Sequence, residues 1–240
     1  MTRQAISLKD ISYSDKGVAI LKNISGSFPE GYITTLVGPS GAGKTTLFRL
    51  CNGLRSPNSG QIYINDKTIN EYNPVELRRK VGIALQSAAM INGTILQNLS
   101  LPFDLQGKQF SKEFALELLQ DVGLTSDFLH RDVKDLSGGQ RQKLSIARTL
   151  VNRPDILLLD EITSSLDRVS QQDIEELIVK INKKYKTTII WITHNLEQAR
   201  TLGNYTWVMM NGQLVEAGPP SLLDDPIDEK VRLFVKGHEQ

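Results

Sequence analysis

The most restrictive feature of the sequence is a short glycine-rich segment between two apolar runs. Residues 38–46 read GPSGAGKTT and fit the pattern G-x-x-x-x-G-K-[ST]. The β-branched run 33–37 before them predicts a strand, and the leucines that follow at helical spacing predict a helix. In that context the pattern predicts a phosphate-binding loop, because glycines let several backbone N–H groups face one anion. The residues of this loop are Gly38, Pro39, Ser40, Gly41, Ala42, Gly43, Lys44, Thr45 and Thr46.

Two side chains of the loop have the chemistry that a nucleotide requires. Lys44 supplies a full positive charge for the β- and γ-phosphates, and Thr45 carries a hydroxyl that can ligate Mg²⁺. The helix that begins at Gly43 or Lys44 adds the positive end of its dipole. A glycine-rich turn without a ligand is the other interpretation, and the lysine and threonine in register argue against it.

Polar side chains follow three apolar runs that read as buried strands. Asp160 and Glu161 end one run, His194 ends a second and Gln86 ends a third. In α/β proteins the carboxyl ends of such strands border the ligand crevice. There, Asp160 can hold Mg²⁺ directly or through water, and Glu161 can polarise a water for attack on the γ-phosphate.

The same strand-end residues also have plainer interpretations. His194 could donate to a γ-phosphate oxygen, but a lone histidine after an apolar strand is more often structural. Gln86 could reach the metal or the attacking water, or be an ordinary strand-end amide. Asp160 and Glu161 could be solvated acids, although the phosphate-binding loop upstream favours the functional interpretation.

The order of apolar patterns indicates the fold class. Residues 5–28 alternate as antiparallel strands, and later strands alternate with helices as in a parallel, doubly wound sheet. From Ser87 to Arg153 the strand signals stop and helical periodicity takes over. We therefore expect an α/β nucleotide-binding core of residues 1–86 and 154–240, which includes an antiparallel β subdomain, and an inserted helical subdomain of residues 87–153.

The nearly balanced charge of the chain excludes attraction of a charged partner by the net charge of the whole protein. Among 240 residues, 28 Lys and Arg oppose 27 Asp and Glu, which leaves a formal net charge of +1. Such a chain does not attract nucleic acid or an anionic membrane through net charge, so no nucleic-acid partner is expected. The N-terminus lacks the apolar run of a signal peptide. We expect the chain to stay in the cytosol and, if it works at a membrane, to rely on a partner that spans it.

Two further features are ambiguous on physical grounds alone. Ser137 is a good N-cap, and Gly138 and Gly139 leave the following N–H groups bare, so the segment through Gln140 is either a second anion site or a capped turn. Tyr13 stands about 25 residues before the phosphate-binding loop and could stack on adenine or be a half-buried strand residue.

Taken in order, these segments resemble those of ATP-binding-cassette ATPases. The resemblance rests on the loop at 38–45, Gln86, the string LSGGQ at 136–140, the pair Asp160-Glu161, the segment 164–167 and His194. The resemblance covers essentially the whole chain and implies a P-loop NTPase core of the RecA-like type. It also implies that two copies pack head to tail, with each ATP between the phosphate-binding loop of one copy and the LSGGQ segment of the other.

The resemblance assigns roles to individual residues and names the cofactors as ATP and Mg²⁺. It implies that Tyr13 stacks on adenine, Gln86 senses Mg²⁺ and water, Glu161 is the catalytic base, and Asp167 communicates across the dimer at the nucleotide. In this family ATP completes the interface between two halves, and hydrolysis removes the phosphate that bridged them.

The resemblance also indicates transport. Transporter members contact an integral membrane permease through the helical insertion, which implies a peripheral location on the cytoplasmic face of the cell membrane. The apolar patch 88–91 suits such a partner, and it equally suits packing within the subdomain. Ile162, where most members have proline, and the segment 98–103 resemble bacterial iron-efflux ATPases of the Fet type, which implies metal export.

Two rival classes fit the sequence less well. A soluble, non-transport ATPase of the same superfamily, acting in DNA repair or translation, usually carries a long coiled coil or two cassettes, and this chain has neither. A P-loop kinase or a regulatory nucleotide-binding module would leave LSGGQ and Asp167 without a purpose.

Overall fold

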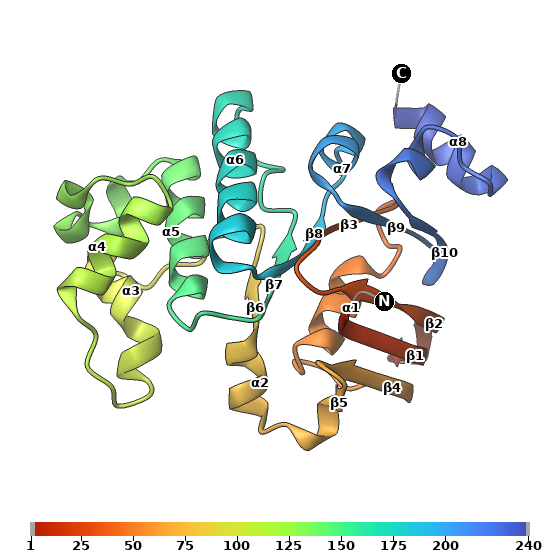
Figure 1. The fold of residues 1–240 in the computed structure, drawn as a ribbon, viewed down its shortest axis with the longest axis horizontal. Helices are drawn as coiled ribbons and strands as arrows, with labels where there is room; N and C mark the ends of the chain where they lie inside the picture. The colour runs from red at the N-terminus through yellow and green to blue at the C-terminus, as the bar shows by residue number, and fades with distance from the viewer. Residues whose placement is uncertain (1–2, 239–240) are drawn as a thin grey trace.

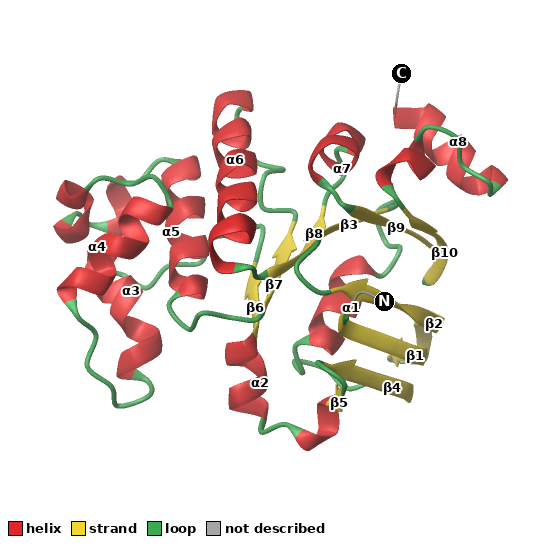
Figure 2. Cartoon of the chain, viewed as in Figure 1, coloured by secondary structure: helices red, strands yellow, loops and turns green. Residues whose placement is uncertain are grey.

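Two β-sheets and the helices around them make up the computed structural model, which describes residues 3–238 (Figures 1 and 2). The smaller sheet has four antiparallel strands in the order β2-β1-β4-β5. Its strands are β1 (Gln4–Asp15), β2 (Val18–Pro29), β4 (Ser59–Ile64) and β5 (Lys67–Thr68). The antiparallel N-terminal strands expected from the sequence are thus confirmed.

The larger sheet has six strands in the order β10-β9-β3-β8-β7-β6. All neighbours are parallel except the last hairpin, β9 with β10. The strands are β3 (Ile33–Val37), β6 (Val81–Ala84), β7 (Ile156–Asp160), β8 (Thr188–Ile192), β9 (Tyr205–Met210) and β10 (Gln213–Gly218). Strands β3, β7 and β8 are buried along their whole length, as their continuous apolar runs predict.

The β9–β10 hairpin closes through a tight turn at Asn211 and Gly212. Asn211 and Gly212 have φ values of +50° and +79°, as a type I′ turn requires. A Cβ on Gly212 would lie 2.1 Å from the carbonyl oxygen of Ile20, so only glycine fits there.

Helices cover the larger sheet and also form a separate group beside it. The helices that alternate with its strands or follow it are α1 (Lys44–Cys51), α2 (Pro74–Lys80), α6 (Arg168–Tyr185), α7 (Leu196–Leu202) and α8 (Glu229–His238). The group consists of α3 (Ile95–Asp104), α4 (Lys112–Asp121) and α5 (Gly138–Leu150), and it lies on the far side of α6 from β8 and α7 (Figure 1). Within the described residues, the stretch 87–153 contains no named strand, as expected.

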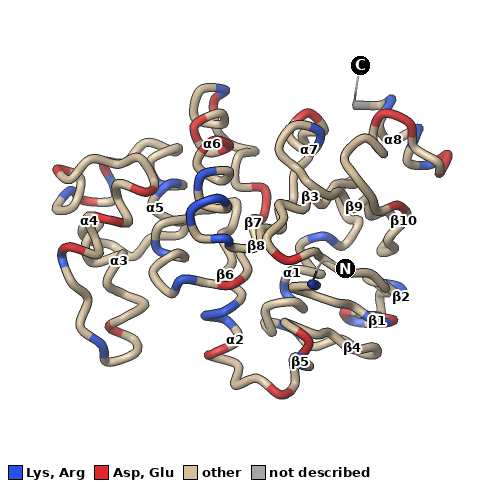
Figure 3. Tube along the Cα trace, viewed as in Figure 1, with Lys and Arg blue, Asp and Glu red and all other residues tan. Residues whose placement is uncertain are grey.

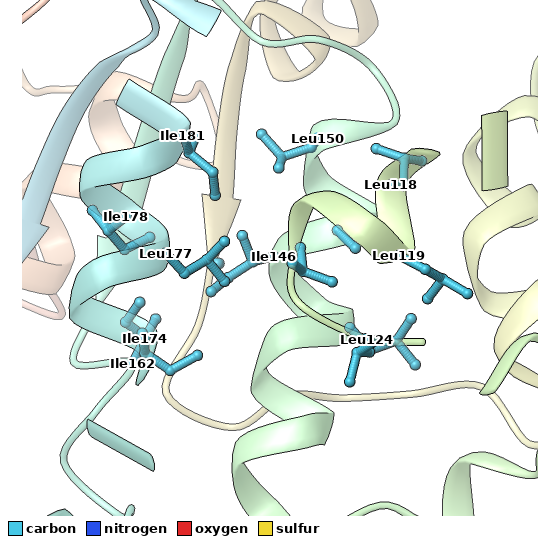
Figure 4. Packing of buried hydrophobic residues seen from close by; sticks show 14 of the residues in the cluster. Leu118, Leu119, Leu124, Ile146, Leu150, Ile162, Ile174, Leu177, Ile178 and Ile181 are labelled. Carbon is cyan, nitrogen blue, oxygen red and sulfur yellow. The ribbon is translucent and has the colours of Figure 1, made fainter. Parts of the chain in front are cut away.

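An apolar cluster joins this helical group to the sheet. Leucine and isoleucine side chains of α4, α5 and α6 interlock along it (Figure 4). The cluster includes Leu118, Leu119, Ile146, Leu150, Ile174, Leu177, Ile178 and Ile181. Full burial of each such side chain contributes about 1.5–3 kcal/mol, so the cluster holds the helical group firmly against α6.

Ile162 belongs to the same cluster. Its side chain is 1% exposed and lies beside Ile174 of α6 (Figure 4). Ile162 is therefore a packing residue of the core and is not exposed on the surface.

A buried carboxylate makes a second connection between α4 and α6. Asp121 is 7% exposed and accepts two hydrogen bonds from Lys184 Nζ, at 2.6 and 2.7 Å, and one from the Tyr185 hydroxyl. The bond to Asp121 raises the pKa of Lys184 to about 12, so the lysine is charged at neutral pH. Both partners of Asp121 come from the end of α6.

None of the helices among residues 3–238 combines the length and the apolar character needed to cross a bilayer.

Replacing the buried Asp121 carboxylate should lower the stability of the fold. Asp121→Asn presents an amide to the Lys184 ammonium, so we expect the free energy of unfolding in urea to fall by about 1–3 kcal/mol. Glu113→Gln, at an exposed position of the same helix, should change it by less than about 0.5 kcal/mol. Equal stability of Asp121→Asn and the wild type would show that the ion pair contributes nothing.

Candidate functional site

The phosphate-binding loop fills the gap between β3 and α1, and two of its glycines are required by close packing. Gly38 has φ +143°, and a Cβ there would lie 1.9 Å from the carbonyl oxygen of Met209. Gly43, the N-cap of α1, has φ +94°, and a Cβ there would lie 2.6 Å from Leu21 Cδ2. Neighbouring strands thus hold the loop in a conformation that only glycine adopts without strain.

The loop surrounds a cavity of about 450 Å³, here called the P-loop cavity. Its lining consists of Ile20, Ser40, Gly41, Ala42, Gly43, Lys44, Thr45, Thr46 and Glu161. The buried Lys44 Nζ donates to the carbonyl oxygens of Gly38 and Pro39 at 2.6 and 3.1 Å. Burial lowers the pKa of Lys44, while the carboxylates of Glu161 and Asp160 oppose that shift. A cation and a helix N-terminus therefore meet in one cavity, which suits a phosphate chain.

Asp160 and Thr45 form an oxygen-rich corner beside the loop. Thr45 Oγ1 donates to Asp160 Oδ1 at 3.1 Å, and Asp160 is the last residue of β7. Burial raises the pKa of Asp160; the bond from Thr45 opposes the rise, and the charge of Glu161 adds to it.

This corner fits Mg²⁺. The residues described include no group of three or more His, Cys, Asp or Glu that could hold a metal unaided. Mg²⁺ commonly takes one or two protein oxygens and completes its shell with phosphate and water, and a hydroxyl beside a carboxylate is such a pair.

Glu161 and His194 lie together because β7 and β8 are neighbours in register. Asp160 pairs with Ile192, and the next residues along bring His194 Nε2 to 2.5 Å from Glu161 Oε1. The backbone N–H of Glu161 donates to the Ile192 carbonyl, and its φ of +51° is left-handed, which costs about 1–2 kcal/mol outside glycine. A strained residue held at the edge of a cavity is typical of functional sites.

Gln86 reaches this turn indirectly. Its Nε2 donates to Ser164 Oγ at 2.9 Å, and that hydroxyl donates to the Glu161 carbonyl at 2.9 Å. Gln86 is exposed and does not line the P-loop cavity. Within this chain its amide is thus attached to the Glu161 turn rather than to the Thr45–Asp160 corner.

The LSGGQ segment forms a second, separate pocket of about 290 Å³, here called the signature pocket. Ser137 caps α5: its Oγ accepts from the Gln140 N–H at 3.3 Å, and Gln140 Oε1 accepts from the Ser137 N–H at 3.0 Å. Gly139 packs against α6, where a Cβ would lie 2.9 Å from Ser170 Oγ. The predicted cap is confirmed, and the pocket shares no lining residue with the P-loop cavity among residues 3–238.

Asp167 caps α6 next to the signature pocket. It accepts from the Ser170 N–H at 3.0 Å and from Ser170 Oγ at 2.7 Å, and these bonds lower the pKa of Asp167. Because Ser170 also lines the signature pocket, Asp167 is connected to that pocket through one residue.

Tyr13 does not lie at the P-loop cavity. Its side chain is 8% exposed, on the buried face of β1 that also carries Ile11, and it belongs to the core under the smaller sheet. Arg55 Cζ lies over the Tyr13 ring, 5.5 Å from its centroid, and the Arg55 guanidinium donates a hydrogen bond to the Tyr13 hydroxyl. The ring therefore offers no free face to adenine in this structure, whereas Ile20 of β2, which no motif singles out, lines the cavity.

Comparison with known proteins identifies the family. A family model described as "ABC transporter" matches residues 21–164 of the 240. The chain belongs to the ABC transporter family. As an ABC ATPase domain, it binds and hydrolyses ATP.

Curated relatives of this ABC ATPase are ATP-binding proteins of transport systems. YjkB of Bacillus subtilis (strain 168), a candidate ABC transporter ATP-binding protein, is 44% identical over 239 residues, which cover 97% of this chain and 94% of YjkB. The methionine import protein MetN of Staphylococcus haemolyticus is 38% identical, over 92% of this chain and 67% of MetN. The glycine betaine/proline betaine protein ProV of Salmonella typhimurium is 36% identical, over 90% of this chain and 56% of ProV.

Solved structures confirm the ABC ATPase fold. The cbiO1 protein from Clostridium perfringens, part of the transporter complex cbiONQ, superposes with a TM-score of 0.85 at 26% identity, over 99% of this chain and 100% of cbiO1. The dimeric ATP-binding cassette MJ0796, bound to ADP and Pi, superposes with a TM-score of 0.79 at 30% identity, over 90% of this chain and 98% of MJ0796.

Removal of the buried cation tests the P-loop of this ABC ATPase. Lys44→Ala deletes a charge-assisted contact with phosphate, so we expect the Kd for ATP in isothermal titration calorimetry to rise at least about tenfold. The exposed Lys108→Ala variant should leave the Kd unchanged. Equal affinities in the two variants would remove Lys44 from the phosphate site.

Proposed function

We propose that this ATP-binding subunit works as a head-to-tail homodimer that holds two ATP molecules and drives substrate movement through a separate integral membrane permease. One observation carries the proposal: the P-loop cavity and the signature pocket each lie at the N-terminus of a helix, and they lie apart within one chain. A second copy, turned end to end, can bring its signature pocket to the P-loop cavity of the first. The structure of MJ0796 with ADP and Pi is dimeric, which supports a dimer of this chain.

Within each site the chain's own groups divide the chemistry. The loop N–H groups and Lys44 would bind the phosphates, and Thr45 and Asp160 would hold Mg²⁺, which supplies charge neutralisation on the phosphate oxygens. Glu161 would accept a proton from the attacking water as general base, oriented by its contact with His194 Nε2 at 2.5 Å.

The remaining residues would report the state of the nucleotide. Gln86, attached through Ser164 to the Glu161 turn, connects the cavity to the chain entering residues 87–153. We assign residues 1–86 and 154–240 to the nucleotide core and 87–153 to a helical subdomain. The Ser137–Gln140 segment and Asp167 would contact the nucleotide held by the other copy.

A groove between the core and the helical group is the proposed permease contact. It has a volume of about 560 Å³ and runs between α2 and β6 on one side and α3 and α5 on the other. Leu105, 79% exposed, stands at its edge with the exposed Val75 and Leu85. The last turn of α2 adds a basic rim (Figure 3), so the groove suits a short helix with apolar and acidic side chains.

The apolar patch 88–91 serves this groove only in part. Met90 packs on the core cluster, while Ala89 lines the groove and its carbonyl accepts from Arg148 at 2.6 Å. Met90 thus packs within the protein, and Ala89 is the residue of the patch that would contact the permease.

The names of the relatives favour transport over the alternative of a soluble ATPase in DNA repair or translation. Attachment to a permease would hold the protein on the cytoplasmic face of the membrane. The same names, which include import of methionine and transport of betaines, give iron export no support.

The dimer is tested by blocking hydrolysis. Glu161→Gln keeps the shape of the side chain and removes the base, so turnover should fall by about 10²–10⁴-fold while ATP binding persists. In size-exclusion chromatography with light scattering, this variant should be a dimer with ATP and Mg²⁺ and a monomer with ADP.

Glu197→Gln, an exposed acid near the same site, is the control and should hydrolyse ATP like the wild type. Rapid hydrolysis by Glu161→Gln would rule out Glu161 as the base. A monomer under both conditions would rule out the homodimer.

The groove is tested by a charge at its edge. Leu105→Asp should lose an integral membrane protein that the wild type retains from detergent-solubilised membranes of its source cells, and should keep basal ATPase activity. Ile227→Asp, which changes a residue that is 91% exposed in another part of the surface, should retain that protein. Retention by both variants would remove the groove as the contact.

A further inference from the structure

A buried amide in α7 has contacts that the proposed catalytic roles do not explain. Gln198 is 3% exposed and lies in the first turn of α7, where its backbone N–H donates to the cap residue Asn195. Its side chain makes hydrogen bonds to three different segments. An amide so buried and so fully bonded fixes whatever it touches, because an unpaired polar group there would be costly.

Two of these segments carry the Glu161–His194 pair. Gln198 Oε1 accepts from Thr193 Oγ1 at 2.6 Å, and Thr193 directly precedes His194. Gln198 Nε2 lies 3.2 Å from Thr163 Oγ1, two residues after Glu161. One side chain thus bridges the loop after β7 and the loop after β8, both of which leave the sheet at the nucleotide edge.

The third segment orients the amide. Gln198 Nε2 donates to Glu175 Oε1 of α6 at 2.7 Å. Because a carboxylate only accepts, it selects the NH₂ group and directs the amide oxygen toward Thr193. Both threonine side chains are buried, at 4% and 3% exposure for Thr163 and Thr193, so water does not substitute for these bonds.

We propose that Gln198 is a positioning residue for ATP hydrolysis: oriented by Glu175, its amide sets the distance between Glu161 and His194. This inference rests on the proposed roles of those two residues. Gln198 acts through Thr163 and Thr193 and does not line the P-loop cavity among the residues described. It should therefore affect turnover and leave ATP binding to the loop unchanged.

The test exchanges the amide and the carboxylate between the two positions. Gln198→Glu sets two carboxylates against each other and removes the donor, so kcat should fall about tenfold to a hundredfold, as expected when a catalytic group is misplaced. The Kd for ATP should stay within about twofold. Gln198→Glu combined with Glu175→Gln restores one donor and one acceptor, and kcat should return to within about threefold of the wild type.

The matched control makes the same exchange on the solvent face of α6. Gln172→Glu and Glu176→Gln are exposed substitutions of the same chemistry, and they should leave kcat unchanged singly and together. Wild-type kcat in Gln198→Glu, or a loss of kcat that the double exchange does not recover, would overturn the proposal.

A second variant separates positioning from folding. Gln198→Met has a similar volume but leaves the partners of the amide unpaired, so its thermal unfolding should move to a lower temperature. Its kcat should fall while its Kd for ATP stays within about twofold of the wild type, which shows that the variant is folded. In a Glu161→Gln background, Gln198→Met should lower the residual hydrolysis less than about twofold, because the group it positions is already gone. Full kcat in Gln198→Met, or a full additional loss in the combined variant, contradicts the proposal.

Failure of the proposed function gives a different result. If Glu161→Gln alone hydrolyses ATP rapidly, the role of Glu161 fails whatever the Gln198 variants do. If Glu161→Gln is inactive and Gln198→Glu is fully active, only the positioning role fails.

Discussion

The parallel pairing of β3, β8 and β7 is the constraint on which the site depends. These strands run in register, so their carboxyl ends reach the same edge of the sheet. There β3 delivers the glycine loop, β7 delivers Asp160 and Glu161, and β8 delivers His194. Because side chains alternate between faces, a slip of one residue in either pairing would turn the functional groups away from one another. Burial of all three strands keeps that register fixed.

The site also contains features that would be unfavourable in isolation and that the surrounding fold supports. Lys44 is buried, Asp160 is buried beside another carboxylate, and Glu161 has a left-handed backbone. A phosphate chain with its cation would relieve the first two, since it supplies charges opposite to those of Lys44 and Asp160. The strained turn at Glu161 is fixed by two hydrogen bonds: Gln198 Nε2 bonds to Thr163 Oγ1, and Ser164 Oγ donates to the Glu161 carbonyl. Binding energy and fold stability are thus coupled at the same few residues.

The helical group is fastened to α6 by two different means. The apolar cluster packs along the helices, and the Asp121–Lys184 pair is one of the polar connections to α6. Because Asp167 and Ser170 lie at the start of that same helix, α6 connects the signature pocket to the sheet edge. Motion of the signature pocket relative to the P-loop cavity would therefore pass through α6.

The sequence by itself determined the secondary structure, the fold class and the nucleotide chemistry. The run 33–37, the spacing G-x-x-x-x-G-K-T and the buried strands that lead to Asp160 and His194 are local patterns. They can be read from the sequence because strand periodicity, glycine conformation and capping act over a few residues. Tertiary structure alone decided which face of a strand each side chain uses and what lies opposite it. Tyr13 is buried under Arg55, Gln86 bonds to Ser164, and Gln198 bonds to Thr163. The two residues of each pair are 35 to 78 positions apart in the chain, so no local pattern in the sequence indicates the contact. Such contacts are fixed by packing of whole elements, which a pattern in one segment does not report.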